Sequence, residues 1–259
     1  MGKVFAIVNQ KGGVGKTTTA INLAASLALA EKEILIIDSD PQGNSTSGLG
    51  INRDDLTKNI YDVYAEKSEI KEVIVQTEIS HLNIIPSSID LLAVEVELVE
   101  KTDRERILQK ALSGIREDFE YIIIDCPPSL GLITLNALVA ADSLIIPVQC
   151  EYYALEGLGM LTRTIRMVRN AFNPDLSVKG ILLTMFDPRN SLSRQVAEEV
   201  KKHFADSVFT TIIPRNVTLG EAPSYGKPAL LYDYRSKGAQ SYLELAKEML
   251  YENGIGQRT

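Results

Sequence analysis

A glycine-rich run followed by a lysine and two threonines stands close to the start of the chain. It reads Gly12-Gly13-Val14-Gly15-Lys16-Thr17-Thr18 and lies between an apolar β-branched run and a helical pattern. Glycines allow backbone N–H groups to converge on phosphate oxygens, and the positive end of the following helix adds to the attraction. In such a loop Lys16 reaches the terminal phosphates and the Thr17 hydroxyl helps to hold Mg²⁺. The run therefore predicts a nucleoside triphosphate site.

Carboxylates follow two other predicted strands. Asp125 comes directly after Tyr121-Ile122-Ile123-Ile124, and Asp38 and Asp40 follow Ile36-Ile37. An acid at the carboxyl end of a buried strand, beside a phosphate loop, is placed to bind Mg²⁺ directly or through water. We therefore predict Asp125 as a metal residue. Position alone does not rank Asp38 against Asp40, since both lie near enough to serve the metal or the attacking water.

The strands that carry these residues are short apolar runs that alternate with longer helical patterns. This alternation is typical of βαβ units, and continuous apolar strands indicate helices on both faces of a sheet. The sequence predicts a doubly wound, mostly parallel α/β fold of the P-loop NTPase type, in one domain over residues 1–259. The predicted strands cover residues 4–8, 34–37, 82–85, 121–124, 143–147, 180–184 and 208–212. The predicted helices cover residues 17–30, 104–117, 155–171, 193–204 and 239–251.

Composition limits the classes of function. The 259 residues carry a net charge of −7, so the molecule as a whole is not expected to attract nucleic acid. Between Arg189 and Lys237, however, eight Lys and Arg stand against five Asp and Glu, which permits a local basic surface. Two cysteines, Cys126 and Cys150, cannot form a disulfide framework and lack the spacing of a metal site. No apolar run reaches the roughly 20 residues of a membrane span and no signal architecture is present, so we expect a cytoplasmic protein.

Lys11 precedes the glycines at a position where the standard phosphate loop begins with glycine. With this lysine the chain resembles the deviant Walker A ATPases, the family of ParA, MinD and the nitrogenase iron protein. The resemblance implies that Lys11 acts across a dimer interface on the partner's nucleotide, the part that an arginine finger plays elsewhere. It also assigns Asp40 to the attacking water and Asp38 to the outer shell of the metal.

Nearly the whole chain is most similar to the ParA/Soj chromosome-partitioning ATPases. This resemblance implies adenine contacts from the stretch that contains Pro214 and Asn216, and a ribose contact from Glu151. The stretches that carry it are Asn9-Gln10-Lys11 with the following loop to Thr19, Asp40-Pro41-Gln42-Gly43-Asn44, Asp125-Cys126-Pro127-Pro128-Ser129-Leu130-Gly131, Ile213-Pro214-Arg215-Asn216-Val217 and Glu221-Ala222-Pro223-Ser224-Tyr225-Gly226-Lys227-Pro228.

The resemblance also implies a cycle of ATP hydrolysis that depends on Mg²⁺. ATP drives formation of a homodimer, the dimer binds double-stranded DNA without sequence preference, and a ParB-type partner protein stimulates hydrolysis and release. Arg189 matches a DNA-contacting position of Soj-like proteins. Thr218 stands where those proteins commonly have arginine, so the phosphate contact of that arginine is expected to move to residues such as Arg215 and Lys227. We expect a nucleoid-associated protein that partitions a chromosome or a plasmid.

Other members of the same class are alternatives. A MinD-like membrane-associated positioning ATPase needs a C-terminal amphipathic helix with a basic face, whereas the segment from Ala246 to Gly254 is mixed or acidic. A redox protein like the nitrogenase iron protein needs paired cysteine ligands, and Cys126 and Cys150 do not match that placement. A small-molecule ligase or kinase is a further alternative, but no stretch resembles a dedicated acceptor pocket.

Overall fold

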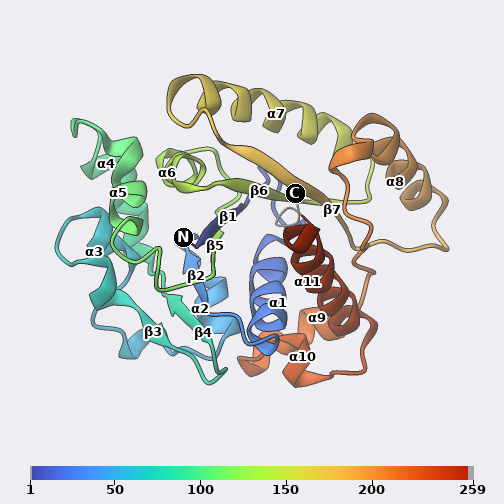
Figure 1. Cartoon of the computed structure of the whole chain (residues 1–259), viewed down its shortest axis with the longest axis horizontal. Coiled ribbons are helices and arrows are strands. Elements are labelled where there is room, and N and C mark those ends of the chain that lie inside the picture. The colour runs from blue at the N-terminus through green and yellow to red at the C-terminus, as the bar shows by residue number, and fades with distance from the viewer. Residues whose placement is uncertain (1, 256–259) are drawn as a thin grey trace.

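The computed structural model describes residues 2–255, whose centre is a single twisted sheet (Figure 1). Seven strands of this part of the chain lie in the order β3-β4-β2-β5-β1-β6-β7. Six of them run parallel, and the short edge strand β3 pairs antiparallel with β4. The strands are β1 Lys3–Ile7, β2 Ile34–Asp38, β3 Val75–Gln76, β4 Leu82–Ile85, β5 Tyr121–Asp125, β6 Ser143–Gln149 and β7 Ser177–Thr184. The predicted doubly wound, mostly parallel α/β fold is confirmed.

Helices cover both faces of the sheet, as the continuous apolar strands predict. α1 and α11 lie on one side, and α6 and α7 lie on the other (Figure 1). The α-helices are α1 Lys16–Leu29, α2 Asn44–Gly48, α3 Ile60–Tyr64, α4 Val94–Glu97, α5 Ile107–Leu112, α6 Leu132–Ala140, α7 Ala154–Ala171, α8 Ser191–His203, α9 Thr218–Glu221, α10 Ala229–Tyr232 and α11 Lys237–Ile255. The 3₁₀ turns used below are η1 Arg53–Asp55, η4 Arg104–Arg106 and η6 Ala222–Tyr225.

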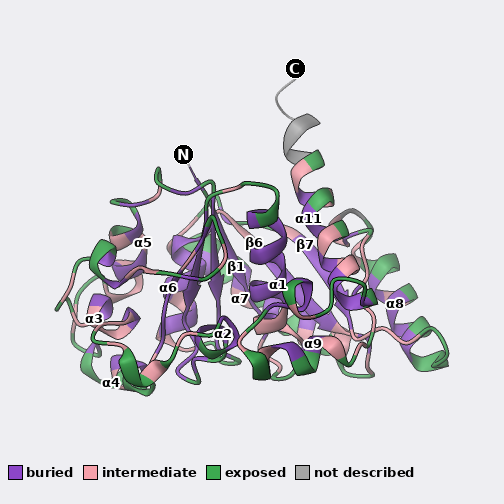
Figure 2. Cartoon of the chain, turned by 90° about the horizontal axis from the view of Figure 1, so that it is seen from below, coloured by how far each residue is buried: buried purple, intermediate pink, exposed green. Residues whose placement is uncertain are grey.

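Two apolar cores lie on opposite faces of the sheet. Because successive strand residues point to opposite faces, Val4 and Ala6 of β1 enter the core under α5, α6 and α7, while Phe5 and Ile7 enter the core under α1 and α11. The central strands are buried along their length, and exposed residues lie on the surrounding helices and loops (Figure 2). The single predicted domain over residues 1–259 stays a prediction, and its last residues, 256–259, lie outside the described part of the chain.

One predicted strand is wrong. Residues 208–212 form no strand, although isolated bridges join Val208 to Ile181 and Pro214 to Phe186 beside β7. The backbone N–H groups of Thr210 and Thr211 donate instead to the two carboxylate oxygens of Glu248 on α11, at 2.6 and 2.9 Å. A side chain far along the sequence therefore takes the donors that a continuous ladder would need.

One predicted helix is shorter than the sequence pattern indicates. The pattern predicts a helix over residues 104–117, but the chain forms η4 and then α5, which ends at Leu112. Ser113 and Gly114 follow directly, and glycine disfavours continuation of a helix because its backbone loses the most conformational freedom. The chain then returns through turns to β5.

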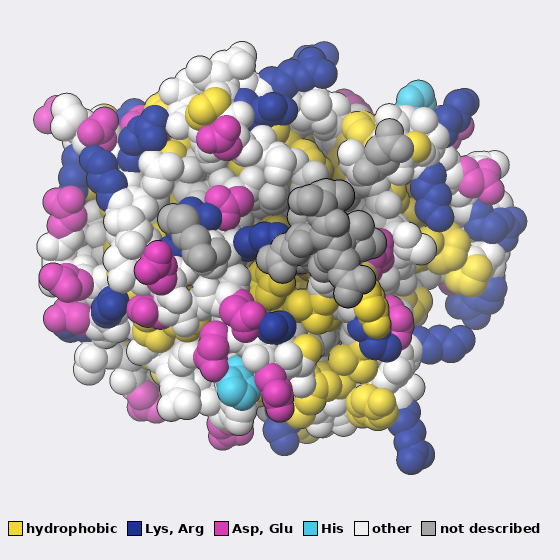
Figure 3. All heavy atoms as spheres, viewed as in Figure 1, with side chains coloured by type: hydrophobic (Ala, Val, Ile, Leu, Met, Phe, Trp, Pro, Cys, Tyr) yellow, Lys and Arg dark blue, Asp and Glu magenta, His cyan; other side chains and the backbone are white. Residues whose placement is uncertain are grey.

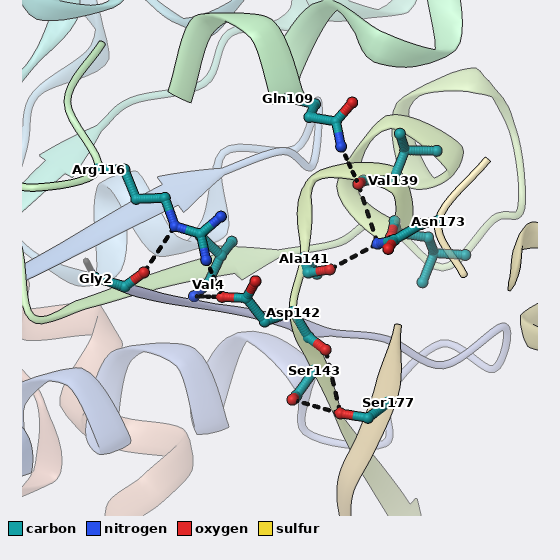
Figure 4. A network of polar contacts seen from close by, with 11 residues as sticks. Gly2, Val4, Gln109, Arg116, Val139, Ala141, Asp142, Ser143, Asn173 and Ser177 are labelled. Atoms are coloured by element: carbon teal, nitrogen blue, oxygen red, sulfur yellow. Dashed lines mark hydrogen bonds and ion pairs between the residues drawn. The ribbon is translucent and has the colours of Figure 1, made fainter. Parts of the chain in front are cut away.

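A polar network fixes the end of the sheet that lies away from the glycine-rich loop (Figure 4). The Asp142 carboxylate accepts a hydrogen bond from the backbone N–H of Val4 at 2.8 Å and forms an ion pair with Arg116. The guanidinium of Arg116 also donates from Nε to the carbonyl oxygen of Gly2 at 2.8 Å. This network holds the start of β1, and so helps to fix where the loop after β1 emerges.

Candidate functional site

The glycine-rich loop joins β1 to α1 at the carboxyl edge of the sheet. Gly13 and Gly15 have φ angles of +73° and +91°, which side chains rarely adopt, so the turn requires glycine at both positions. α1 begins at Lys16, and no side chain caps its N-terminus. The first N–H groups of the helix therefore point toward the loop without an internal partner, an arrangement that binds anions such as phosphate.

Lys16 lies beneath this loop with only 6% of its surface exposed. Its ammonium group donates to the carbonyl oxygen of Lys11 at 3.1 Å, which closes the loop over the side chain. Burial lowers the pKa of Lys16, while the nearby carboxylates Asp125 and Asp40 oppose this shift. A buried cation is thereby held where phosphate oxygens would approach the loop.

Asp125 and Asp38 stand side by side at the carboxyl ends of neighbouring strands. They are register partners in the pairing of β5 with β2, and both are fully buried. One oxygen of Asp125, Oδ2, accepts a hydrogen bond from the Ser45 hydroxyl at 2.7 Å. Its other oxygen, Oδ1, is buried and has no hydrogen-bond partner in the described part of the chain. An unpartnered carboxylate oxygen at this edge is available for an additional ligand.

Asp38 has its carboxylate oxygens occupied by the loop that follows β2. Oδ2 accepts from the backbone N–H and the hydroxyl of Thr46, at 2.8 and 2.7 Å, and Oδ1 accepts from the backbone N–H of Asp40 at 3.2 Å. These bonds hold the segment from Asp40 to Thr46 against the end of β2. Asp38 therefore shapes the loop, and it lies beside Asp125, the residue predicted to bind the metal.

Asp40 lies in this loop with 8% of its surface exposed. Its Oδ1 accepts from the backbone N–H of Gln42 at 2.9 Å, and its carbonyl oxygen accepts from the N–H of Gly43 at 2.8 Å. Oδ2 accepts no hydrogen bond from residues 2–255, so it can accept one from a further group. The sequence alone did not distinguish the roles of Asp38 and Asp40. In the described part of the chain both carboxylate oxygens of Asp38 accept hydrogen bonds, whereas only one oxygen of Asp40 does.

The residues of this edge fit the Mg²⁺ ion expected beside a phosphate loop. The free Oδ1 of Asp125 supplies one hard oxygen ligand, and the Thr17 hydroxyl lies close enough to lower the pKa of Asp125. The described residues contain no cluster of three or more His, Cys, Asp or Glu side chains that could hold a metal alone. Mg²⁺ usually keeps waters and uses one or two protein ligands with substrate phosphates, so this small donor set is sufficient.

Burial raises the pKa values of both carboxylates well above the ordinary 3.8. For Asp38 burial and the Asp125 charge raise the pKa to about 7 against hydrogen bonds from Thr46 and Asp40. For Asp125 burial raises the pKa to about 6, against the hydrogen bond from the Ser45 hydroxyl and the influence of the nearby Thr17 hydroxyl. The nucleotide-free site is therefore an unfavourable place for two negative charges, which a bound cation would stabilise.

These shifts predict how the stability of the nucleotide-free protein depends on pH. Between pH 4 and 7 the folded state binds more protons at Asp38 and Asp125 than the unfolded chain, so their contribution is greatest at low pH. The free energy of unfolding should fall as pH rises from about 4, by up to about 1.4 kcal/mol per pH unit for each group, and should level off above the folded pKa values of about 6 and 7. Urea unfolding in EDTA from pH 5 to 8 measures this slope. Asp38→Asn should flatten it, and an equal slope in that variant would contradict the assignment.

The side chain of Lys11 points away from the phosphate loop, toward Glu151. Its backbone N–H donates to the Asn9 side chain at 3.0 Å, and its ammonium pairs with Glu151 at 3.3 Å. The two side chains of this pair are 41% and 47% exposed. The structure therefore brings Lys11 and Glu151 together beside the phosphate loop, in a position open to solvent.

A cavity of about 190 Å³ adjoins the other side of the loop. Gly15 and Thr18 line it from the loop and α1, and Pro214 and Asn216 line it from the segment beyond residue 212. The Oδ1 atom of Asn216 is buried and has no hydrogen-bond partner within residues 2–255. The structure thus brings the predicted adenine-contacting stretch against the phosphate loop.

The predicted DNA-contacting residues lie on the surface after β7. Arg189, whose side chain is 88% exposed, donates from Nε and Nη2 to the two oxygens of Asp187, at 3.0 and 2.9 Å. This bidentate contact lowers the pKa of Asp187 to about 2. The exposed Arg215 comes near because its N–H donates to the carbonyl oxygen of Phe186 at 3.0 Å. Lys227 is also exposed but lies farther along the chain, beyond η6.

Lys and Arg side chains gather over α8, at the right of Figure 3. A larger hollow of about 850 Å³ lies elsewhere, between α3 and α5, and its lining is rich in lysine. Three of these lysines are already neutralised, since Lys71, Lys101 and Lys110 pair with Asp118, Glu66 and Asp103. Size alone therefore does not make this hollow a binding site for an anion.

Several polar residues of the site were not predicted from the sequence. Ser45 and Thr46 orient the two buried carboxylates, and the Thr184 hydroxyl donates to the carbonyl oxygen of Val14 at 2.8 Å. The adjacent hydroxyls directly after Asn44 are a usable signal, because hydroxyls following a carboxylate-bearing turn commonly return hydrogen bonds to it. Thr184 offers no such signal, since it meets the loop only through the pairing of β6 with β7 and β1.

A phosphate loop between the central strand β1 and a helix, with buried carboxylates at the ends of the adjacent strand β5 and of β2 beyond it, defines a P-loop nucleoside triphosphatase. Residues 2–178 match a family model described as an AAA domain. The chain is 55% identical over 249 residues to the sporulation initiation inhibitor protein Soj of Bacillus subtilis, covering 96% of this chain and 98% of that protein. It is 56% identical over 250 residues to the chromosome partitioning protein ParA of Myxococcus xanthus, covering 96% and 88%.

Solved structures share the same architecture. Cobyrinic acid a,c-diamide synthase from Mycobacterium smegmatis with bound ADP and magnesium superposes with a TM-score of 0.87 at 37% identity, covering 100% of this chain and 98% of that one. The cell division ATPase MinD of Pyrococcus furiosus superposes with a TM-score of 0.81 at 26% identity, covering 97% and 99%.

The chain belongs to the ParA/Soj family of partitioning ATPases. The predicted family, the ATPase activity and the use of ATP with Mg²⁺ are confirmed at this level. No helix in the described part of the chain has the length and apolar character needed to span a membrane.

Proposed function

We propose that this ATPase is a DNA-binding switch controlled by ATP. The position of Lys11 carries the proposal, because its ammonium extends away from its own phosphate loop to a half-exposed Glu151. ATP-bound subunits pair face to face, and Lys11 of each subunit reaches the nucleotide of its partner. A ligand bridged in this way favours the dimer over the monomer, which is what an ATP-driven switch requires.

Hydrolysis uses the residues at the carboxyl edge of the sheet. Gly12, Gly13, Val14, Gly15 and Thr18 surround the phosphates, and Lys16 neutralises the β- and γ-phosphates. Thr17 and Asp125 would hold Mg²⁺, with Asp38 beside them in its outer shell, and the ion would neutralise charge on the phosphates. Asp40 orients and activates the attacking water through Oδ2, its oxygen without a hydrogen bond. Lys11 from the partner stabilises the charge that develops during phosphoryl transfer.

The base and the ribose bind at the two sides of the loop. Pro214 and Asn216 contact adenine in the cavity of about 190 Å³ that they line beside the phosphate loop. In the dimer Lys11 leaves Glu151 and binds the partner's nucleotide. Glu151 then contacts the ribose of that nucleotide. The ion pair of the free subunit is thus replaced by contacts across the dimer.

DNA binding follows from dimerisation. Arg189, Arg215 and Lys227 contact phosphates, and the dimer doubles these contacts, which gives salt-sensitive binding despite the acidic whole molecule. Arg215 and Lys227 compensate for the absence of arginine at Thr218. A ParB-type partner stimulates hydrolysis and so releases the DNA, and the protein acts in the cytoplasm on the nucleoid as one domain over residues 1–259.

Retention on non-specific double-stranded DNA, measured with ATP, with ADP and without nucleotide across a salt series, tests this function. We expect retention with ATP only, and we expect it to fall steeply as the salt concentration rises. Equal retention with ADP would contradict nucleotide control. Co-sedimentation with anionic vesicles in ATP, without DNA retention, would instead support the MinD-like alternative.

Arg189→Ala should weaken this retention while ATP-induced dimerisation stays intact. The slope of log affinity against log salt should become shallower by about 0.9 for each DNA phosphate that the variant no longer neutralises. Asp187→Asn is the matched variant, because it removes the carboxylate that pairs with Arg189 and should strengthen retention. Unchanged retention in both variants at moderate salt would show that Arg189 does not contact DNA.

A further inference from the structure

The guanidinium of Arg53 covers the loop that carries Asp40. Arg53 opens η1, ten residues after Gly43, and its Nη1 donates to the carbonyl oxygen of Gln42 at 2.7 Å. Nη2 lies 3.5 Å from the carbonyl oxygen of Pro41, the preceding carbonyl of the same turn. One planar group therefore faces two consecutive carbonyls of a single turn, a match to the forked geometry of arginine.

The contact is close, and Gly43 makes it possible. A Cβ atom at position 43 would lie 2.9 Å from Cζ of Arg53, and Gly43 has a φ angle of +63°. A side chain here would displace the guanidinium and would strain the turn. Within residues 2–255 no carboxylate forms an ion pair with Arg53, so its donors are directed to the turn.

The turn connects Arg53 to Asp40 through two hydrogen bonds. Arg53 holds the carbonyl oxygen of Gln42, and the N–H of the same residue donates to Oδ1 of Asp40 at 2.9 Å. From the inner side, Asp38 accepts from the N–H of Asp40 at 3.2 Å. The loop is therefore held from inside by a buried carboxylate and from outside by Arg53. Without Arg53 the outer half of the turn keeps only the bonds within itself.

We propose that Arg53 is a positioning residue for ATP hydrolysis. It fixes the backbone on both sides of Gln42. The Pro41 carbonyl that faces Nη2 belongs to the same peptide unit as the Gln42 N–H, which orients the Asp40 carboxylate and leaves Oδ2 toward the attacking water. The proposal rests on the role of Asp40 given above. Arg53 contacts the turn rather than the phosphate loop, so its removal affects the chemical step more than the binding of ATP.

The test is steady-state ATP hydrolysis by the full chain with Arg53→Ala and Arg53→Lys. For Arg53→Ala we expect kcat to fall about 10-fold or more while KM for ATP changes less than about 2-fold, because small displacements of reacting groups are costly. Lysine can donate to the Gln42 carbonyl as a single point charge, so Arg53→Lys should recover part of kcat. A rise in KM that accounts for the whole loss of kcat/KM would overturn the proposal.

Arg104→Ala is the matched control, since Arg104 also donates to two consecutive backbone carbonyls, those of Leu98 and Val99, away from the loop. This variant should keep kcat within about 2-fold of the wild-type value. Its thermal midpoint should be similar to that of Arg53→Ala, as expected for surface substitutions. Equal losses of kcat in the two variants would overturn a specific role for Arg53. If Asp40→Ala retains turnover, the role of Asp40 fails; if only Arg53→Ala retains it, this inference alone fails.

Discussion

Replacing Lys16 with alanine is expected to abolish every response of the protein to ATP. The substitution removes the buried cation that lies under the phosphate loop, together with its bond to the carbonyl oxygen of Lys11. The Lys16 ammonium donates directly to that loop, so the phosphates would lose their principal charge partner within the subunit. We expect kcat/KM for ATP to fall at least about 100-fold, the scale for removal of one preorganised donor in a water-poor site. ATP-dependent DNA retention should disappear with it.

The loss is expected without unfolding. Only 6% of Lys16 is exposed, so its charge is poorly solvated, and this burial lowers its pKa. The thermal midpoint of Lys16→Ala should therefore lie close to that of the wild type, whereas the further stabilisation that ATP gives the wild type should be missing. Lys32→Ala, which removes an exposed ion pair with Glu120, is the matched control and should keep the ATP response. ATP-dependent DNA retention by Lys16→Ala would refute the proposed switch.

The carboxylates of the site could be predicted because parallel strands bring their ends to one edge. Asp38 and Asp125 each follow an uninterrupted apolar run, and the pairing of β2 with β5 makes them neighbours. The different hydrogen-bond partners of the two carboxylates could not be predicted from their positions in the sequence. That distinction depends on Thr46 and Ser45, which reach the carboxylates only after α2 has folded back over the strand ends.

Contacts between distant parts of the chain explain what sequence patterns did not predict. Residues 208–212 have the β-branched character of a strand, yet Glu248, 37 or 38 positions away, binds two of their N–H groups. Lys11 and Glu151 are 140 positions apart, so sequence periodicity cannot predict their ion pair. Local pattern thus predicted which segments are buried in the sheet. Side chains from other elements decided how its edge residues are used.

Replacing Asp40 with alanine is expected to separate ATP binding from ATP hydrolysis. Asp40 accepts from Gln42 through one carboxylate oxygen and keeps Oδ2 free, so the substitution removes the group proposed to activate water and leaves the phosphate loop intact. We expect kcat to fall at least about 100-fold, as is usual when a positioned general base is lost. ATP-induced dimerisation should persist, and so should DNA retention with ATP. Phosphate release and size-exclusion chromatography with ATP measure the two properties.

Release of DNA by the ATP-bound complexes of the wild type and of Asp40→Ala can then be compared. A wild-type complex should leave DNA when a ParB-type partner is added, whereas the Asp40→Ala complex should remain bound, because release follows hydrolysis in the proposed cycle. Asp175→Ala removes an exposed carboxylate from another loop and should release DNA like the wild type. Unchanged turnover in Asp40→Ala would exclude Asp40 as the residue that activates water. Lost turnover with normal release would instead separate DNA binding from hydrolysis, and the cycle would then need a different release step.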